Sequence, residues 1–305
     1  MNSVDRRMRK ISANLIIPVS SPPLPNGIVL LDEKGKVLEV KDTGGRLREE
    51  AGLEFYSGVI LPGFVLPWVR LPEMPESLAG LDRALMRNGI RGAGVILAES
   101  GLNREGLELM RASAVSYHPI IELDALPGEE DFEVFNRGVE LLSRAWNEFS
   151  LSGTLVPGRN LDDLSELKRY IREYNAVHEH MRVPGYDTGI PGAALTERAS
   201  TSRSGNVKDA ASLKGEDDPD ILPGKPLEYP PENSLNILKK MQTSRPDADL
   251  LRVLRCYTLE AAGRIFEKDV LGSLEQGKSP GLNLVSGIET GNLRMTGKTS
   301  LRILV

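Results

Sequence analysis

The stretch that decides the fold is Gly58-Val-Ile-Leu-Pro-Gly-Phe-Val-Leu-Pro-Trp-Val-Arg-Leu-Pro-Glu73. An apolar segment, 59–61, runs into Pro62-Gly63, and a second apolar segment, 64–69, follows. Proline cannot donate to a strand ladder, and glycine tolerates backbone angles that other residues avoid. We therefore predict two strands that meet at Pro62-Gly63, where the chain leaves one sheet and enters another.

Short strands separated by turn signals are predicted on the N-terminal side of this hinge. Pro22-Pro-Leu-Pro-Asn-Gly27 is typical of a loop, and Asp32-Glu-Lys-Gly-Lys36 is typical of a hairpin turn. Residues 46–52 are expected to form a helical turn. The strands are expected at 14–18, 28–31, 37–40 and 54–61.

Beyond the hinge, segments with helical spacing alternate with buried strand-like runs. This alternation predicts parallel strands joined by helical crossovers. Gly92-x-Gly94 lacks the rest of a dinucleotide fingerprint, so we interpret it as a packing feature. Helices are expected from Leu78 to a stop at Asn88-Gly89, and at 104–112, 131–150 and 164–174, with strands at 92–98, 114–123 and 153–156.

The C-terminal third contains a long polar segment, followed by helical segments and a final strand. Residues 182–232 are rich in Gly, Pro, Ser and charge, with almost no apolar run, which indicates a flexible loop. A helix that starts near Asn233 is stopped at Arg245-Pro246, and 248–266 is predicted to be one amphipathic helix. Residues 292–305 are expected to add a closing strand.

Two motifs resemble the amidohydrolase superfamily. Pro62-Gly63-Phe64-Val65 is similar to the family's hinge, Pro-Gly-Phe-hydrophobic-Asn-x-His-x-His. Gly272-Ser-Leu-Glu-Gln-Gly-Lys278 is similar to its return motif, Gly-Ser-Leu-Glu-x-Gly-Lys-x-Ala-Asp-Leu, with Pro280-Gly281 in place of Ala-Asp. The chain looks closest to the deaminase and chlorohydrolase-like group that includes aminodeoxyfutalosine deaminase.

This resemblance implies an α/β fold in two parts. The first is a composite β-sandwich built from both chain ends, 1–62 and 268–305. The second, 63–267, is a truncated, incomplete (β/α) TIM-type barrel, in which 182–232 is the flexible loop.

The family's metal ligands come from the ends of barrel strands, where the metal lowers the pKa of a bound water to roughly 7. Trp68 and Arg70 stand where the first strand would carry two histidines, and Gly158 stands at a later histidine. Gly224-Lys-Pro-Leu227 carries no aspartate where the last strand would supply one. We therefore expect no catalytic residue, no metal and no cofactor, and a hydrolase relative that acts as a binding or scaffold protein.

The alternative is an active hydrolase or deaminase of non-peptide C–N bonds with a reduced site. It would hold one divalent metal (Zn, Fe or Mn) on His118, His178 and His180, the chain's three histidines, with Glu99 or Glu122. The simpler interpretation puts His178 and His180 at a solvated helix end, His118 in a packed strand and the two glutamates on a rim. A third possibility is a decaying gene product without function.

Arg70 lies at one of the positions where the family would have a metal-ligating histidine. Arg159 lies directly beside another, Gly158. Guanidinium groups are permanently charged and bind carboxylate or phosphate as a fork. One hypothesis is a pocket for a small anionic metabolite, with Trp68 as a stacking wall. The competing interpretation is that both arginines are salt-bridged rim residues.

The amino-acid composition limits the classes of partner that we expect. A net charge of −5 argues against nucleic acid or an anionic membrane, and no window holds the roughly 18 consecutive apolar residues of a membrane helix. Cys256 is the only cysteine, which excludes an intrachain disulfide and is typical of a cytoplasmic protein. We expect Cys256 to be buried and inert. A homo-oligomer or an intact relative is the expected protein partner.

Overall fold

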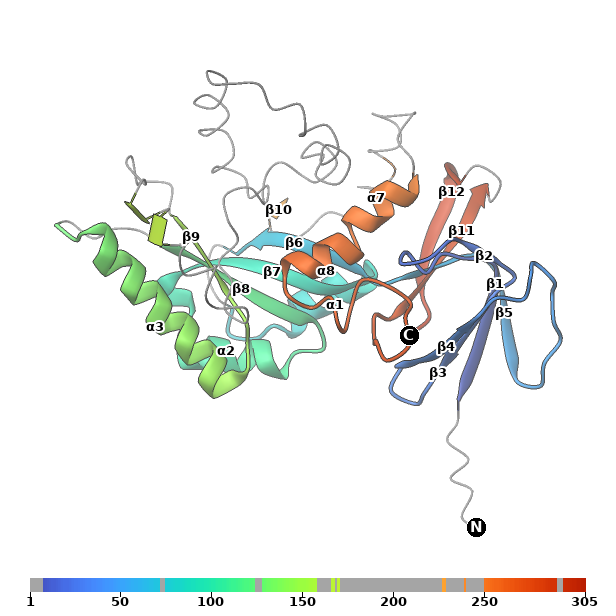
Figure 1. Cartoon of the computed structure of the whole chain (residues 1–305), viewed down its shortest axis with the longest axis horizontal. Coiled ribbons are helices and arrows are strands. Elements are labelled where there is room, and N and C mark those ends of the chain that lie inside the picture. Colours follow the sequence, from blue (N-terminus) through green and yellow to red (C-terminus); the bar gives the residue numbers. More distant parts are fainter. Residues whose placement is uncertain are drawn as a thin grey trace, which may run out of the picture. The chain divides into compact units, whose positions relative to one another are not determined.

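The computed structural model describes residues 8–71, 75–123, 128–157, 166–167, 169–170, 227–228, 239, 250–289 and 293–305. Their strands form two sheets, one of seven strands and one of five (Figure 1). Contacts divide the chain into two compact units, Met1–Pro67 with Gly80–Gly92 and Glu232–Val305, and Trp68–Ala79 with Ala93–Pro231. The domain boundaries expected at 62/63 and 267/268 stay predictions. So does the loop at 182–232, of which the structure describes 227–228.

The seven-stranded sheet takes its strands from both ends of the chain, as the sequence predicts. Its order is β12-β11-β5-β1-β3-β4, with β2 paired to β1, and its pairs are antiparallel except β1 with β5. In the described residues these strands make one hydrogen-bonded sheet, so the two packed sheets of the expected sandwich stay a prediction. The strands are β1 Arg9–Ile16, β2 Leu24–Pro25, β3 Ile28–Leu31, β4 Val37–Lys41, β5 Leu53–Pro62, β11 Leu282–Glu289 and β12 Arg294–Ile303.

The hinge lies where the sequence places it. β5 ends at Pro62 in the seven-stranded sheet and β6 begins at Phe64 in the other. The Gly63 N–H donates to Pro280 O (3.0 Å), and a Cβ at Gly63 would lie 2.3 Å from that oxygen. Glycine is therefore required by close backbone approach. The buried Asn283 amide reinforces the junction by donating to Gly89 O (2.9 Å) and Pro62 O (3.4 Å).

The five-stranded sheet has the order β10-β6-β7-β8-β9 and is curled (Figure 1). Its pairs β10–β6 and β8–β9 are parallel, as the βα alternation predicts. α2 packs on β8, and α3 packs on β8 and β9. The strands are β6 Phe64–Arg70, β7 Ile90–Ala98, β8 Ser116–Leu123, β9 Thr154–Pro157 and β10 Leu227–Glu228, and the helices are α1 Ala79–Arg87, η1 Glu99–Gly101, α2 Arg104–Ala112 and α3 Asp131–Phe149.

The predicted single helix at 248–266 is wrong. It is two helices, α7 Leu250–Cys256 and α8 Leu259–Arg264, separated at Tyr257-Thr258. Tyr257 O leaves the helical ladder and accepts from the Val65 N–H of β6 (2.8 Å), while Thr258 Oγ1 donates to Leu254 O (2.6 Å). A tertiary hydrogen bond thus interrupts a continuous apolar periodicity.

Residues 46–52 form no helical turn, which is a second correction. The segment is irregular, with Glu50 bound to Lys10 Nζ (3.0 Å) and Glu50 O accepting from Leu53 N (3.1 Å). The helix expected at 164–174 is described at 166–167 and 169–170, which are helical, and the rest lies outside the described residues.

Two buried clusters fix the strands. One covers a face of the seven-stranded sheet and includes Ile11, Ile60 and Leu284. The other packs Val65 of β6 against Ala261, Ala262, Ile265 and Leu271. Gly92 of β7 belongs to this contact, because a Cβ there would lie 2.7 Å from Leu271 Cδ1 and 2.9 Å from Ile265 Cδ1. The packing interpretation of this glycine is confirmed.

Candidate functional site

The carboxyl ends of parallel strands are where α/β folds place their sites. In β8 and β9, Leu123 and Leu155 face α3, since both lie within 3.0 Å of the point where a Cβ on Gly138 of that helix would be. Side chains alternate along a strand. His118 and Glu122 of β8 therefore line the opposite face, away from α3.

Arg70, the last residue of β6, forms a bidentate ion pair with Glu122 near the end of β8. Arg70 Nη1 donates to Glu122 Oε2, and Nη2 donates to Oε1 (3.1 Å). The side chains are 21% and 15% exposed. Arg70 Nε is buried and has no hydrogen-bond partner in the described structure. Since β7 lies between β6 and β8, the pair reaches across one strand.

A second ion pair network stands beyond the end of β7. Glu99, in η1, accepts from Arg137 Nε (2.6 Å) and Nη2 (2.8 Å), and Arg137 Nη1 donates to Glu129. These carboxylates raise the pKa of Arg137 above its ordinary value. The network ties η1 to α3, so Glu99 is committed to a structural contact.

His118 is buried in β8, beside Thr154 of β9. It is 2% exposed, its Nε2 lies 2.6 Å from Thr154 Oγ1, and burial lowers its pKa to about 3. Its imidazole is therefore neutral near pH 7. His118 and Glu122 are four residues apart on one strand, roughly 13 Å at the usual rise, so they do not meet at one point.

The other predicted site residues are placed only in part. Trp68 lies in β6, its side chain outside what the structure describes, and Arg159, His178 and His180 lie outside the described residues altogether. The anion pocket of Trp68, Arg70 and Arg159 stays a prediction.

Two features near the carboxyl ends of these strands were not predicted from the sequence. Sequence reasoning noted no aspartate at Gly224-Lys-Pro-Leu227 and did not consider Glu228, whereas β10 pairs with β6 in the register Leu227 with Val69 and Glu228 with Arg70. A glutamate therefore stands next to Arg70 on the neighbouring strand. It also missed Arg137, because nothing in the periodicity of 131–150 distinguishes that residue from the helix's other solvated charges.

The described residues do not fit a metal ion. No group of three His, Cys, Asp or Glu side chains among them is arranged to hold one. Both oxygens of Glu122 accept from Arg70, and a guanidinium at a ligand position repels a divalent cation. His118 points its Nε2 at Thr154 instead.

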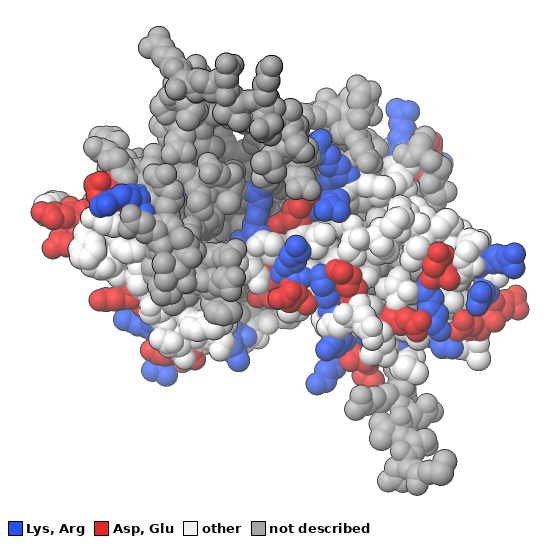
Figure 2. All heavy atoms as spheres, in the orientation of Figure 1, with Lys and Arg blue, Asp and Glu red and all other residues white. Residues whose placement is uncertain are grey.

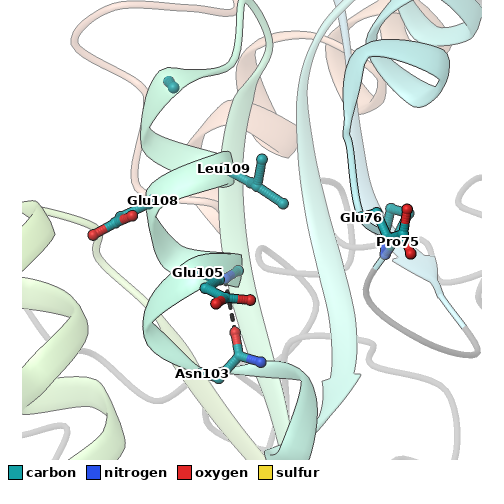
Figure 3. Close-up of a pocket in the computed structure, with 8 residues that line it drawn as sticks. Pro75, Glu76, Asn103, Glu105, Glu108 and Leu109 are labelled. Atoms are coloured by element: carbon teal, nitrogen blue, oxygen red, sulfur yellow. Dashed lines mark hydrogen bonds between the residues drawn. The ribbon is translucent and has the colours of Figure 1, made fainter.

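A pocket of about 560 Å³ lies beside α2, and two of its polar side chains already have partners. Asn103 Oδ1 caps the helix by accepting from Gly106 N (2.8 Å), and Glu108 pairs with Arg104 (3.1 Å). Figure 3 shows Leu109 directed toward Pro75 and Glu76, while Glu108 points away from them. The pocket offers no set of converging reactive groups in the described residues.

Charges on the described surface are mixed in sign, without one extended basic face in the view of Figure 2. None of the described helices is long and apolar enough to cross a membrane. Cys256 is buried, its pKa is raised to about 12 chiefly by that burial, and its Sγ donates to Glu260 Oε2 (3.2 Å). The expected burial of this cysteine is confirmed.

Comparison with solved structures places the fold. An adenosine deaminase from Xanthomonas campestris with bound zinc has a TM-score of 0.53 at 13% identity, over 91% of this chain and 84% of that one. Guanine deaminase from E. coli gives 0.53 at 13%, over 92% and 88%. A Xaa-Pro dipeptidase with bound methionine gives 0.50 at 12%, over 95% and 100%. The chain shares the fold of these enzymes.

Sequence comparison adds no closer relation. No family model matches the chain, and no curated protein matches it. At 12–13% identity the shared fold says nothing about the reaction, because one fold supports many chemistries. The resemblance read from the hinge and return motifs is thus supported at the level of the fold.

Proposed function

We propose that this chain is an amidohydrolase-superfamily protein that has lost metal-dependent hydrolysis and acts by binding, as a small-molecule binder or a scaffold. The observation that carries the proposal is the Arg70–Glu122 ion pair. Arg70 stands at a position where the resemblance puts a metal-ligating histidine, and its guanidinium occupies the carboxylate that a metal would otherwise use.

The electrostatics of this pair favour binding over metal chemistry. Arginine keeps its charge at any physiological pH, and its planar fork matches both oxygens of a carboxylate. The pair holds β6 and β8 together at their carboxyl ends without an ion. A ligand at this edge would therefore meet a fixed dipole rather than a metal-bound hydroxide.

An anionic metabolite is the ligand class that the sequence suggests. Such a ligand would have to replace Glu122 on Arg70, because both terminal nitrogens of the guanidinium already donate to that carboxylate. Pairing with a second copy or with an intact relative is the protein-partner form of the same proposal.

Metal analysis of the purified full chain tests the proposal. After expression with added zinc, iron and manganese, we expect substoichiometric metal and a melting temperature that EDTA does not change. Adenosine, guanine and an Xaa-Pro dipeptide should show no turnover above buffer. One metal ion per chain together with turnover that EDTA abolishes would establish the active-hydrolase alternative instead.

A further inference from the structure

The pocket beside α2 contains two carboxylates that have no partner among the described residues. Two other polar side chains of its lining are engaged, since Asn103 caps α2 and Glu108 pairs with Arg104. Glu76 and Glu105 also line the pocket, and neither side chain forms an ion pair or hydrogen bond with a described residue. No lysine or arginine is among the described lining residues. The charge that the pocket presents to a ligand is therefore negative.

The rest of the lining is largely apolar and comes from two segments of the same compact unit. Leu109 and Ala112 belong to α2, and Pro75 lies between β6 and α1. Figure 3 shows Glu105 and Leu109 on the side of α2, with Pro75 and Glu76 across from them. Small-molecule sites have volumes of roughly 300–1,000 Å³ and combine an apolar lining with a few polar groups. At about 560 Å³ this pocket has the size and the composition of such a site.

A role in the fold accounts for only one of the two carboxylates. Glu105 is in the first turn of α2, where the helix dipole favours an anion. Glu76 has no such role, because the turn before α1 is closed by Ser77, whose Oγ accepts from the Ala79 N–H (3.2 Å). A hollow lined by charges of one sign raises the local concentration of ions of the opposite sign. Glu76 and Glu105 thus favour a cation in the space between them.

We propose that this pocket binds a small organic cation, an ammonium group on a short apolar chain. The ammonium has three N–H donors, which suit the acceptors of Glu76 and Glu105, and the chain packs on the apolar lining. A metal ion is not the expected ligand, because no group of three His, Cys, Asp or Glu in the described part of the chain is arranged to hold one. The site uses neither Arg70 nor Glu122, so it does not rest on the proposed function.

Thermal shift on the full chain at pH 7 tests the site with butylamine and 1,4-diaminobutane, added as hydrochlorides at constant ionic strength against sodium chloride. Butanol and sodium butyrate are the matched ligand controls, because they keep the apolar chain and lack the cation. At ten times the dissociation constant we expect the amines to raise the melting temperature by roughly 2–3 °C and the rise to saturate. Butanol and butyrate should give no saturable rise.

Three glutamine variants separate this pocket from general attraction of cations to the chain. Glu76→Gln and Glu105→Gln keep the shape of each side chain and remove its charge, so both should lose most of the response to the amines. Glu108→Gln is the matched control, because Glu108 lines the same pocket but pairs with Arg104 and points away from Pro75 in Figure 3. All three glutamates are exposed, so we expect the variants to fold.

The outcomes divide plainly. A saturable response to either amine that falls in Glu76→Gln and Glu105→Gln and persists in Glu108→Gln supports the site, and a response to the diamine alone assigns the ligand as a dication. No saturable response of the wild-type chain to either amine overturns the proposal. So does an equal response in wild type and the Glu76→Gln, Glu105→Gln double variant, a response that butanol reproduces, or an equal loss in Glu108→Gln.

Discussion

Neutralising Glu122 should destabilise the chain through the charge that it leaves behind. Glu122→Gln keeps the shape of the side chain and removes its anion, so Arg70 retains a partly buried cation whose Nε already lacks a partner in the described structure. Exposed ion pairs contribute about 0–1 kcal/mol, and breaking a fully buried one costs about 3–5 kcal/mol. With side chains 21% and 15% exposed, this pair falls between those limits, at about 2 kcal/mol.

The assay is a double-mutant cycle with Arg70→Gln, Glu122→Gln and the double variant. For a chain of this length about 2 kcal/mol corresponds to a fall of roughly 4 °C in melting temperature. Glu108→Gln is the control, because its pair with Arg104 is exposed (56% and 74%) and should cost less than about 0.5 kcal/mol. Additive effects at Arg70 and Glu122, within about 0.5 kcal/mol, would refute the coupling.

Three further predictions follow from other contacts. Glu122→Gln should also free Arg70 to bind phosphate, so this variant should gain a saturable thermal shift with phosphate that the Arg70→Gln, Glu122→Gln double variant lacks; equal responses would contradict this. His118 has a folded-state pKa of about 3, below its unfolded value of 6.5, so the unfolded chain binds the proton first and stability falls as pH drops from about 6.5 towards 3. His118→Gln should flatten the decline in melting temperature between pH 6.5 and 4.5, and an unchanged slope would exclude this origin. Gly63→Ala should lower the melting temperature by at least roughly 4 °C, since its Cβ would meet Pro280 O at 2.3 Å, whereas Gly297→Ala, with open space around it, should change it little.

The sequence predicts the elements whose signal is local. β3, at Ile28–Leu31, and α2, at Arg104–Ala112, have the bounds that apolar runs and helical spacing indicate. α3 ends one residue early because Ser150 adopts a left-handed φ of 53°. Apolar runs and helical spacing can be recognised within a short stretch of sequence, so the local pattern is enough to predict these elements.

Elements set by distant partners escape the same reasoning. β1 begins at Arg9, five residues before the expected start, where Arg9 binds Glu54 on the paired strand (2.8 and 2.9 Å). The break between α7 and α8 depends on a hydrogen bond from Val65, almost two hundred positions earlier in the chain. Neither contact leaves a trace in the local pattern.

The candidate site shows the same division. The sequence places Arg70 where the resemblance puts a metal-ligating histidine, and it offers ion pairing as one interpretation. It cannot name Glu122 as the partner, because the two residues are 52 positions apart and meet only when β6, β7 and β8 align. Binding of an anion to Arg70 also depends on the free energy needed to break its ion pair with Glu122, and a sequence pattern does not contain that energy.

The packed core and the Arg70–Glu122 pair occupy different parts of the strands. Val65 and Gly92 pack against the α8 region, and Leu123 and Leu155 pack against α3. These contacts lie on the helix-facing side of the strands, where volume changes cost several kcal/mol. Arg70 and Glu122 lie at or near strand ends, so a change in this polar pair leaves that packing in place. We therefore expect substitutions on the helix-facing side of the strands to cost more stability than substitutions at the carboxyl edge.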